Sequence, residues 1–309
     1  MNTPVDAMPE SAPGPLTPAP PVNPAVRPLY WSVRRELWEN RSIPIAPLAV
    51  AAITLFGYAI SLISLPERRR AVLLLDAAQQ KAAIQQPYDL AAMMILSIAV
   101  IVGVFYCLDA LYGERRDRSI LFWKSLPVSD LTTVLSKAAI PLVVLPLLSF
   151  AIIVTTQIIM FLLGGAVLLM NDLSAATTWM HLKFFQQTVI LLYGLITLAL
   201  WHAPVYGWLL LVSGWARRAP FLWAVLPLVG VSFLEQMALN SSHFAALLHS
   251  RLSGGIGKAF DFDAQGHLDS LAQLTPGNFF SAPGLWFGLA YAAAFLAAAV
   301  WLRRDGEPI

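Results

Sequence analysis

The chain has 309 residues, of which 58% are hydrophobic and only 12% are charged. Soluble domains carry about 25% charged residues, so this composition excludes an ordinary soluble domain and fits a protein whose solvent is lipid. The net charge of +2 gives no reason to expect a nucleic acid partner, and the single cysteine, Cys107, excludes an intrachain disulfide and a multi-cysteine zinc site.

The N-terminal region changes character near residue 29. Residues 1–28 contain nine of the 22 prolines and few large apolar side chains, so we expect a disordered, proline-rich tail. Residues 29–42 place aromatic side chains beside arginines, which is typical of a helix that lies in the membrane interface. An ordinary flank of the first membrane span is the alternative.

Six apolar blocks follow, and each is long enough to cross a bilayer core of about 30 Å as a helix. The sequence therefore predicts an all-α, six-helix transmembrane domain over residues 43–304. The predicted spans cover residues 44–65, 89–111, 138–163, 186–212, 219–239 and 283–302.

The Lys and Arg residues predict the orientation of these spans. If the N-terminus is cytoplasmic, 13 of the 20 basic residues lie in inner segments and 7 in outer segments. The positive-inside rule then predicts that both termini are cytoplasmic, with the basic cluster at residues 68–70 as the one discordant feature. On this topology residues 240–282 form a long extracytoplasmic segment, and residues 66–88 form a short helix and turn.

The familiar motifs of enzymes and metal proteins are missing from the sequence. Residues 253–260, SGGIGKAF, resemble a phosphate-binding loop, but the motif needs a glycine where Leu252 stands and Ser or Thr in place of Ala259. We therefore expect no ATPase site in this chain. Three histidines and three aspartates in the outer segment match no metal-ligand spacing, so we expect no metal site: His243, His249, His267, Asp261, Asp263 and Asp269.

A few polar side chains fall inside the apolar blocks. Ionisable and polar groups in lipid usually face a bundle interior or a cavity, so Gln157, His202 and Glu235 are candidates for a translocation path. Contact with water at the membrane boundary is the alternative. Gly284, Gly288 and Ala292 fall at four-residue spacing and form a small-residue face on the last span, which allows close packing against a helix of this chain or of a second copy.

The most charged and amphipathic stretch is residues 113–137, between the second and third blocks. We expect a helix that begins at Glu114 and ends before Pro127, because the residue before a proline avoids helical geometry. Ser129 or Asp130 then caps the next helix.

This stretch resembles the ABC-2 type permeases of bacterial ABC transporters. The resemblance lies in Glu114-Arg115, the short amphipathic run from Ser119 to Ser125, the sequence Leu126-Pro127-Val128-Ser129, and Lys137 at the start of the third span. The helix before the first span, the six-span layout and the enlarged outer segment before the sixth span are similar too.

The resemblance implies a permease subunit of the cell inner membrane that is not itself an enzyme and holds no cofactor. In such permeases the amphipathic helix docks in a cleft of a separate ATP-binding subunit, and a second permease, either another copy or a homologue, completes the transporter. Phe122 and Trp123 would be the anchors, with charged residues at the rim. The implied docking residues are Glu114, Arg115, Arg118, Ile120, Phe122, Trp123 and Leu126.

Two other functions are compatible with the pattern. A membrane scaffold or assembly factor would use the same stretch to hold a cytoplasmic protein without transport. An ion-coupled carrier is disfavoured because few charged residues lie within the spans. The substrate is open among lipids, hydrophobic peptides and drugs, and the direction of transport, export, follows from the resemblance alone.

Overall fold

The computed structural model describes residues 28–125, 128–174, 183–253, 255–262, 268 and 270–304. Over this part of the chain the regular elements are helices, which confirms the all-α prediction. One isolated antiparallel β-bridge pairs Phe260 with Leu274. The tail predicted for residues 1–28 lies outside the described residues except for Pro28, which begins the first helix.

Within the described residues, six helical segments are long and apolar enough to cross a membrane, as predicted for a multi-pass membrane protein. They are Ser42–Val72, Ala77–Arg116, Asp130–Met170, Phe184–Trp215, Pro220–Leu239 and Pro283–Arg304. Several of these segments extend well beyond the predicted apolar blocks. The blocks are bounded by polar residues, but a helix can continue through polar residues into the aqueous region. The second begins at Ala77, where the Asp76 side chain caps it by accepting a hydrogen bond from the Gln79 amide.

The helices that build these segments are named here in chain order. The first half contains α1 (Pro28–Glu39), α2 (Ser42–Ser61), η1 (Leu62–Ser64), α3 (Leu65–Val72), α4 (Ala77–Ala110), α5 (Tyr112–Arg116), α6 (Ser119–Lys124) and α7 (Asp130–Ala139). The second half contains η2 (Ile140–Val144), α8 (Leu145–Met170), α10 (Phe184–Trp215), α11 (Pro220–Leu239), α12 (His243–Ser253), α13 (Ile256–Ala259), η3 (Leu271–Gln273), α14 (Pro276–Ser281) and α15 (Pro283–Arg304).

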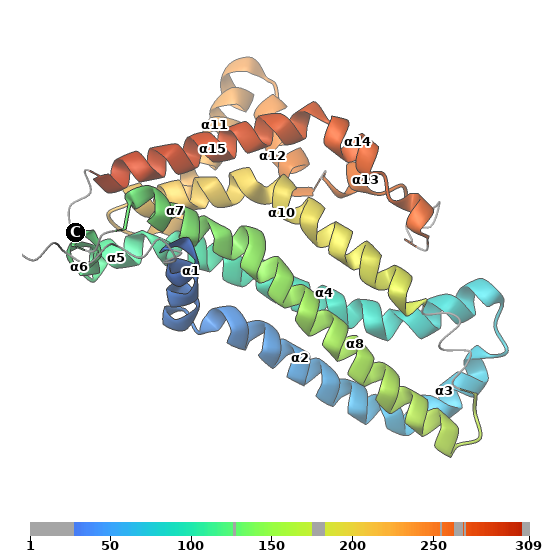
Figure 1. Ribbon diagram of the computed structural model, residues 1–309. Coiled ribbons are helices and arrows are strands. Elements are labelled where there is room, and N and C mark those ends of the chain that lie inside the picture. The colour runs from blue at the N-terminus through green and yellow to red at the C-terminus, as the bar shows by residue number, and fades with distance from the viewer. Residues whose placement is uncertain are drawn as a thin grey trace, which may run out of the picture.

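The long helices lie side by side in one elongated bundle, and α1 crosses one end of it (Figure 1). At that end α1, α5, α6 and the last turn of α15 come together, and we call it the α5–α6 end. The ends of the described chain, at Pro28 and Arg304, therefore lie at the same end of the bundle, as an even number of crossings requires.

Proline shapes the third span locally. Pro141 lies in η2, a π-helical turn between α7 and α8. A proline lacks the amide that a regular helical turn would use, and the wider turn accommodates it without ending the helix. As a result α7, η2 and α8 form one continuous helical path from Asp130 to Met170.

The main core forms where α10 packs between α4 and α15. Buried side chains from α4 and α10, including Tyr106, Cys107, Tyr206 and Leu210, form one apolar cluster. The Cys107 side chain is fully buried in it, in agreement with its interpretation as a small core residue. Gly207 brings α10 close to α15, because a Cβ there would lie 3.3 Å from the carbonyl oxygen of Ala292. The small-residue face of the last span thus packs within the chain.

The connection after the first span explains the discordant basic cluster. A short helix and turn form there, as predicted, although the turn ends at Asp76 and α4 begins earlier than expected. The Arg68 guanidinium donates to the Ser61 carbonyl at 2.8 Å, and so satisfies a free carbonyl at the end of α2. Arg69 is buried. These arginines have structural roles in the loop.

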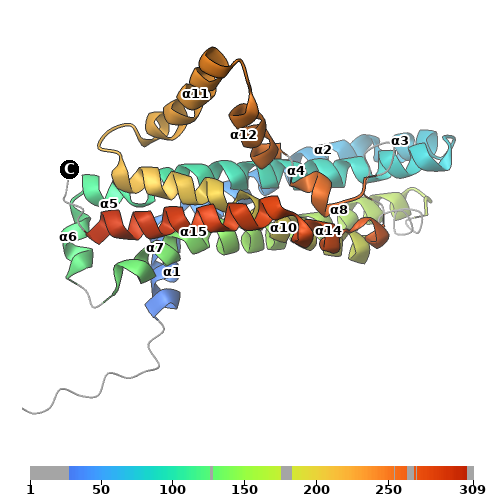
Figure 2. The same cartoon turned by 90° about the horizontal axis from the view of Figure 1, so that it is seen from above.

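The described part of residues 240–282 packs against the N-terminal half of α10. Phe260 and Phe279 join Ile190, Trp201 and Leu285 in a second apolar cluster. By contrast, α11 and α12 form a hairpin that stands away from the bundle (Figure 2). Ala224 is the one buried residue of the 20 in α11, and its carbonyl accepts a hydrogen bond from the indole of Trp208.

Candidate functional site

The segment between the second and third spans is two short helices and not the single helix predicted from Glu114 to Leu126. α5 ends at Arg116, and the chain turns through Asp117 and Arg118 before α6 begins at Ser119. Arg118 has a left-handed backbone, with φ of 58°, which ends the first helix. Leu126 and the predicted helix stop at Pro127 lie outside the described residues.

The third span begins as predicted. The Ser129 hydroxyl accepts a hydrogen bond from the Thr132 amide at 3.1 Å and caps α7.

α5 is bound tightly to the end of α10. The Ser213 hydroxyl accepts hydrogen bonds from the amides of Leu111 and Tyr112, both at 2.9 Å. In return, the Arg115 guanidinium donates to the Gly214 carbonyl at 2.5 Å. The last carbonyls of a helix have no partner within it, so Arg115 satisfies groups that would otherwise be unpaired.

A cluster of six charged side chains lies directly behind α5, and we call it the ion cluster. It consists of Arg35, Glu36, Glu114, Asp130, Lys137 and Arg303. Three carboxylates face three cations in this cluster, and the exposed Glu39 adds a fourth carboxylate at its edge, 3.5 Å from the Arg35 guanidinium. Its members come from α1, α5, α7 and α15, so it joins the helix before the first span to the starts or ends of three spans.

Lys137 and Arg303 are the centres of this cluster. The Lys137 ammonium lies 2.9 Å from the Glu36 carboxylate and 3.1 Å from that of Glu114. The Arg303 guanidinium pairs with Glu114 and, through Nε, with the Asp130 carboxylate at 3.0 Å. Lys137 is 2% exposed and Glu36 1% exposed, so both charges are held in place by their partners rather than by water.

Glu36 is further fixed from α4. The Tyr106 hydroxyl donates a hydrogen bond to its carboxylate at 2.8 Å. Burial alone would raise the pKa of Glu36, but the charge and hydrogen bond of Lys137, the Tyr106 hydroxyl and Arg35 outweigh burial and lower that pKa below its usual value. Glu36 is therefore ionised at neutral pH.

The exposed part of the segment is the outer face of α6. Leu121 and Phe122 are each 60% exposed. Trp123 is half-buried beside them, with its ring edge-on to Phe122 at 4.9 Å and the Arg35 guanidinium 3.8 Å from its centroid. Trp123 therefore connects the exposed face to the ion cluster through Arg35.

The predicted docking residues are thus divided between the inside and the outside of the protein. Glu114, Arg115 and Ile120 point inward: Glu114 is 8% exposed and Ile120 is 2% exposed. The prediction that Glu114 and Arg115 form an outer rim is wrong in this respect, because bonds to α7, α15 and α10 hold their side chains. Arg118 and Phe122 are exposed as predicted.

The three candidates for a translocation path are bound to different elements. Gln157 donates to the Tyr88 carbonyl at 3.3 Å, and the two nitrogens of His202 lie 2.9 Å and 3.3 Å from the carbonyls of Leu198 and Leu252. Glu235 accepts hydrogen bonds from Ser241 and from the first amides of α12. Each of the three side chains forms hydrogen bonds within the protein, and their role in transport stays a prediction.

Sequence reasoning did not identify the ion cluster. The sequence pattern places Lys137 at the start of a span and Glu114 after one, and it counts Arg303 among the basic residues, but it gives no role to Glu36. A usable signal is present for Lys137, Glu114 and Arg303, because each lies within three residues of an apolar block, where an unpaired charge is unfavourable. The pairing itself joins residues 101 and 189 positions apart and leaves no local pattern.

Comparisons of this chain with protein-family models, with curated proteins and with solved structures gave no match. In the part of the chain that the structure describes, no three His, Cys, Asp or Glu side chains lie close enough together to hold a metal ion. His267, Asp263 and Asp269 lie outside that part.

Proposed function

We propose that this chain is the transmembrane permease subunit of an ATP-driven exporter of the inner membrane, similar to the ABC-2 type permeases. A separate subunit binds and hydrolyses ATP, and it docks on the α5–α6 segment. The observation that carries the proposal is an exposed apolar face on α6 directly in front of the ion cluster.

The exposed face of α6 has the composition of a small protein interface. Leu121 and Phe122 supply apolar area, and the exposed residues Arg116, Asp117 and Arg118 lie beside them as a polar rim. Specific interfaces combine an apolar or aromatic centre with such a rim. Phe122 is the anchor of this surface, and Trp123 supports it from behind.

The ion cluster supplies the mechanical connection. A push on α6 acts through α5 on Glu114, whose carboxylate holds Lys137 on the third span and Arg303 on the last. Separating a buried charge from its partners costs about 3–5 kcal/mol, so these elements respond as one body. Closure of the ATP-binding subunits would in this way move the third and sixth spans together with α1.

The proposal includes a second permease unit, either another copy or a homologue. α11 is long and apolar enough to span the membrane, yet only Ala224 is buried within the chain. The rest of its apolar surface is free for lipid and for that second unit.

Co-purification from native membranes tests the proposal. A permease should bring down a protein that hydrolyses ATP, and Phe122→Ala should lower the ATP turnover of the complex at least about ten-fold, as for an interface anchor. Phe105→Ala is the matched control, because Phe105 is 62% exposed on the α4 membrane span and lies outside the α5–α6 segment.

Two results would contradict the proposal. One is a stable partner without nucleotide binding, which would favour a scaffold. The other is an ATPase whose turnover is the same in the Phe122→Ala variant, the Phe105→Ala control and the unmodified complex.

A further inference from the structure

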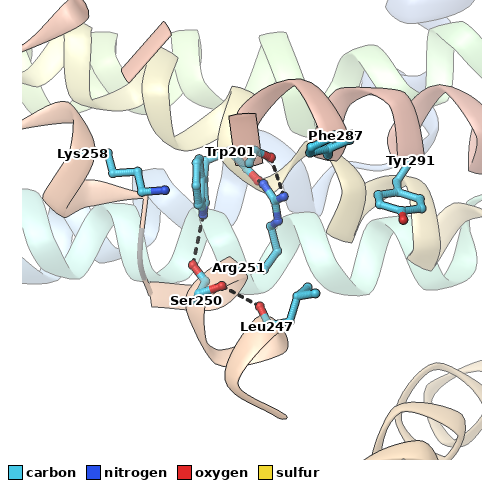
Figure 3. A pocket seen from close by; sticks show the side chains of 8 residues that line it. Trp201, Leu247, Ser250, Arg251, Lys258, Phe287 and Tyr291 are labelled. Carbon is cyan, nitrogen blue, oxygen red and sulfur yellow. Dashed lines mark hydrogen bonds between the residues drawn. The ribbon is translucent and has the colours of Figure 1, made fainter. Parts of the chain in front are cut away.

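A second group of cations lies at the opposite end of α15 from Arg303. There α10, α12, α13 and α15 enclose a cavity of about 390 Å³ (Figure 3). The cavity lining includes Trp201, Leu247, Arg251, Lys258, Phe287 and Tyr291.

Arg251 projects from α12 towards α15. Its guanidinium donates to the Gly284 carbonyl at 2.6 Å and lies 4.6 Å from the centroid of the Trp201 ring. The missing side chain of Gly288 provides the space, since a Cβ there would lie 2.6 Å from the guanidinium. Burial lowers the pKa of Arg251, so a nearby anion would stabilise its charge.

Lys258 lies on the other side of the same indole (Figure 3), with its ammonium 5.4 Å from the ring centroid. The ring is fixed between the two cations because its Nε1 donates to the Ser250 carbonyl at 3.3 Å. Gly255 leaves room for it, since a Cβ at that position would overlap the indole. The loop that only resembled a phosphate-binding motif thus supplies both Gly255 and Lys258 to this site.

Neither cation is neutralised by the protein over the described residues. No carboxylate there forms an ion pair with Arg251 or Lys258. The carbonyl groups of Trp201 and Gly284 accept hydrogen bonds from Arg251 but carry no net charge. A guanidinium has five N–H donors, so Arg251 has further donors to offer an anion. Two cations on one aromatic ring without a carboxylate form a site for an anion.

The cavity lies about one bilayer thickness from the ion cluster along α15. Gly284 and Arg303 are 19 residues apart on this helix, which at about 1.5 Å per residue corresponds to about 29 Å, close to one bilayer core. A lipid whose headgroup reaches the Gly284 end of α15 would therefore belong to the leaflet opposite the α5–α6 end. Trp201 lines the cavity and Trp286 lies two residues from Gly284, and tryptophan is enriched at membrane interfaces.

We propose that this cavity binds the phosphate of an anionic lipid headgroup from the leaflet opposite the α5–α6 end. Arg251 and Lys258 hold the phosphate, with the planar guanidinium fork suited to two of its oxygens. Leu247, Phe287 and Tyr291 are each more than 60% exposed beside the cations and offer apolar surface to the acyl chains. That apolar surface favours a lipid over free phosphate, and the site does not depend on the docking of an ATP-binding subunit.

Native mass spectrometry of the full chain in neutral detergent tests this site. Phosphatidylglycerol should bind about ten-fold more tightly than phosphatidylcholine, because both lipids offer the same phosphate but choline adds a positive charge that Arg251 and Lys258 repel. Lys258→Gln and Arg251→Gln should each remove that preference. Lys258→Gln is the more informative variant, because among the described residues its ammonium has a contact with the Trp201 ring and no hydrogen bond that folding would lose. Arg70→Gln, at an exposed cation on α3, is the matched control and should keep the preference.

Inorganic phosphate at millimolar concentration separates the two sources of the anion. It should leave bound phosphatidylglycerol in place, because it lacks the acyl chains. Full displacement by inorganic phosphate would overturn the lipid assignment in favour of a free anion. Equal binding of the two lipids, or an unchanged preference in both the Lys258→Gln and the Arg251→Gln proteins, would overturn the site itself.

Discussion

The two ends of α15 carry their charges in opposite ways. At the α5–α6 end, Arg303 is buried among carboxylates from α5 and α7. At the other end, Arg251 and Lys258 face the Gly284 turn without a carboxylate among the described residues. At one end the charges join helices, and at the other two cations lie beside one indole ring. Our proposals assign the transmission of movement to the first end and ligand binding to the second.

The largest effect should come from breaking the ion cluster. Lys137→Met leaves Glu36 and Glu114 without their shared cation, so we expect a loss of about 3–5 kcal/mol in the free energy of unfolding. Denaturant titration in mixed micelles measures it. Lys124→Met, at an exposed cation on α6, is the control and should change stability by less than about 1 kcal/mol.

The double variant Lys137→Met with Glu114→Gln sharpens the same point. The double variant should lose clearly less free energy of unfolding than the two single variants lose in sum. The reason is that removing a cation and its carboxylate together leaves neither of them buried without its partner. Strict additivity would show that the cluster does not act as a unit.

A smaller effect should follow from crowding the opposite end. Gly255→Ala forces a methyl group against the base of the Trp201 side chain, so we expect a loss of about 1–3 kcal/mol from overpacking. Gly257→Ala, two residues further on, meets no atom within 4 Å and should be neutral or stabilising by up to about 1 kcal/mol. Thermal unfolding of both proteins measures the contrast, and equal midpoints would mean that Trp201 is not fixed at this position.

The smallest effect concerns pH. Because the folded pKa of Glu36 is lowered, its ionised form contributes stability above the unfolded pKa of about 4.3, and that contribution is lost as the pH falls through the folded value. The stability difference between the unmodified protein and Glu36→Gln should therefore be constant from about pH 8 to pH 5 and shrink below about pH 4. A difference that grows in acid would show that the pKa is shifted upward instead.

Several features could be predicted from sequence because they depend on local composition. The six spans follow from apolar runs, and the cap at Ser129 follows from residue type. The helix before the first span was predicted for residues 29–42 and is found at Pro28–Glu39.

Other features depend on partners that are distant in sequence. The turn at Arg118 between α5 and α6 contains no glycine that would predict a left-handed backbone. It lies between Glu114 and Ile120, whose side chains are both buried against the bundle. The ion cluster and the Trp201 site each combine residues from three or more helices. The burial of Glu114 and the half-buried position of Arg115 could not be predicted, since charged residues in a loop are usually solvated.

The role of α6 as a docking element is the central claim, and photo-cross-linking tests it most directly. A photoreactive amino acid at position 122, introduced into the full chain in native membranes, should capture a single protein that binds and hydrolyses ATP. The same amino acid at position 105, equally exposed on a membrane span, should not capture that protein. Capture of an ATPase at position 122 alone is the result we predict; absence of any nucleotide-binding protein there, or equal capture at both positions, would contradict it.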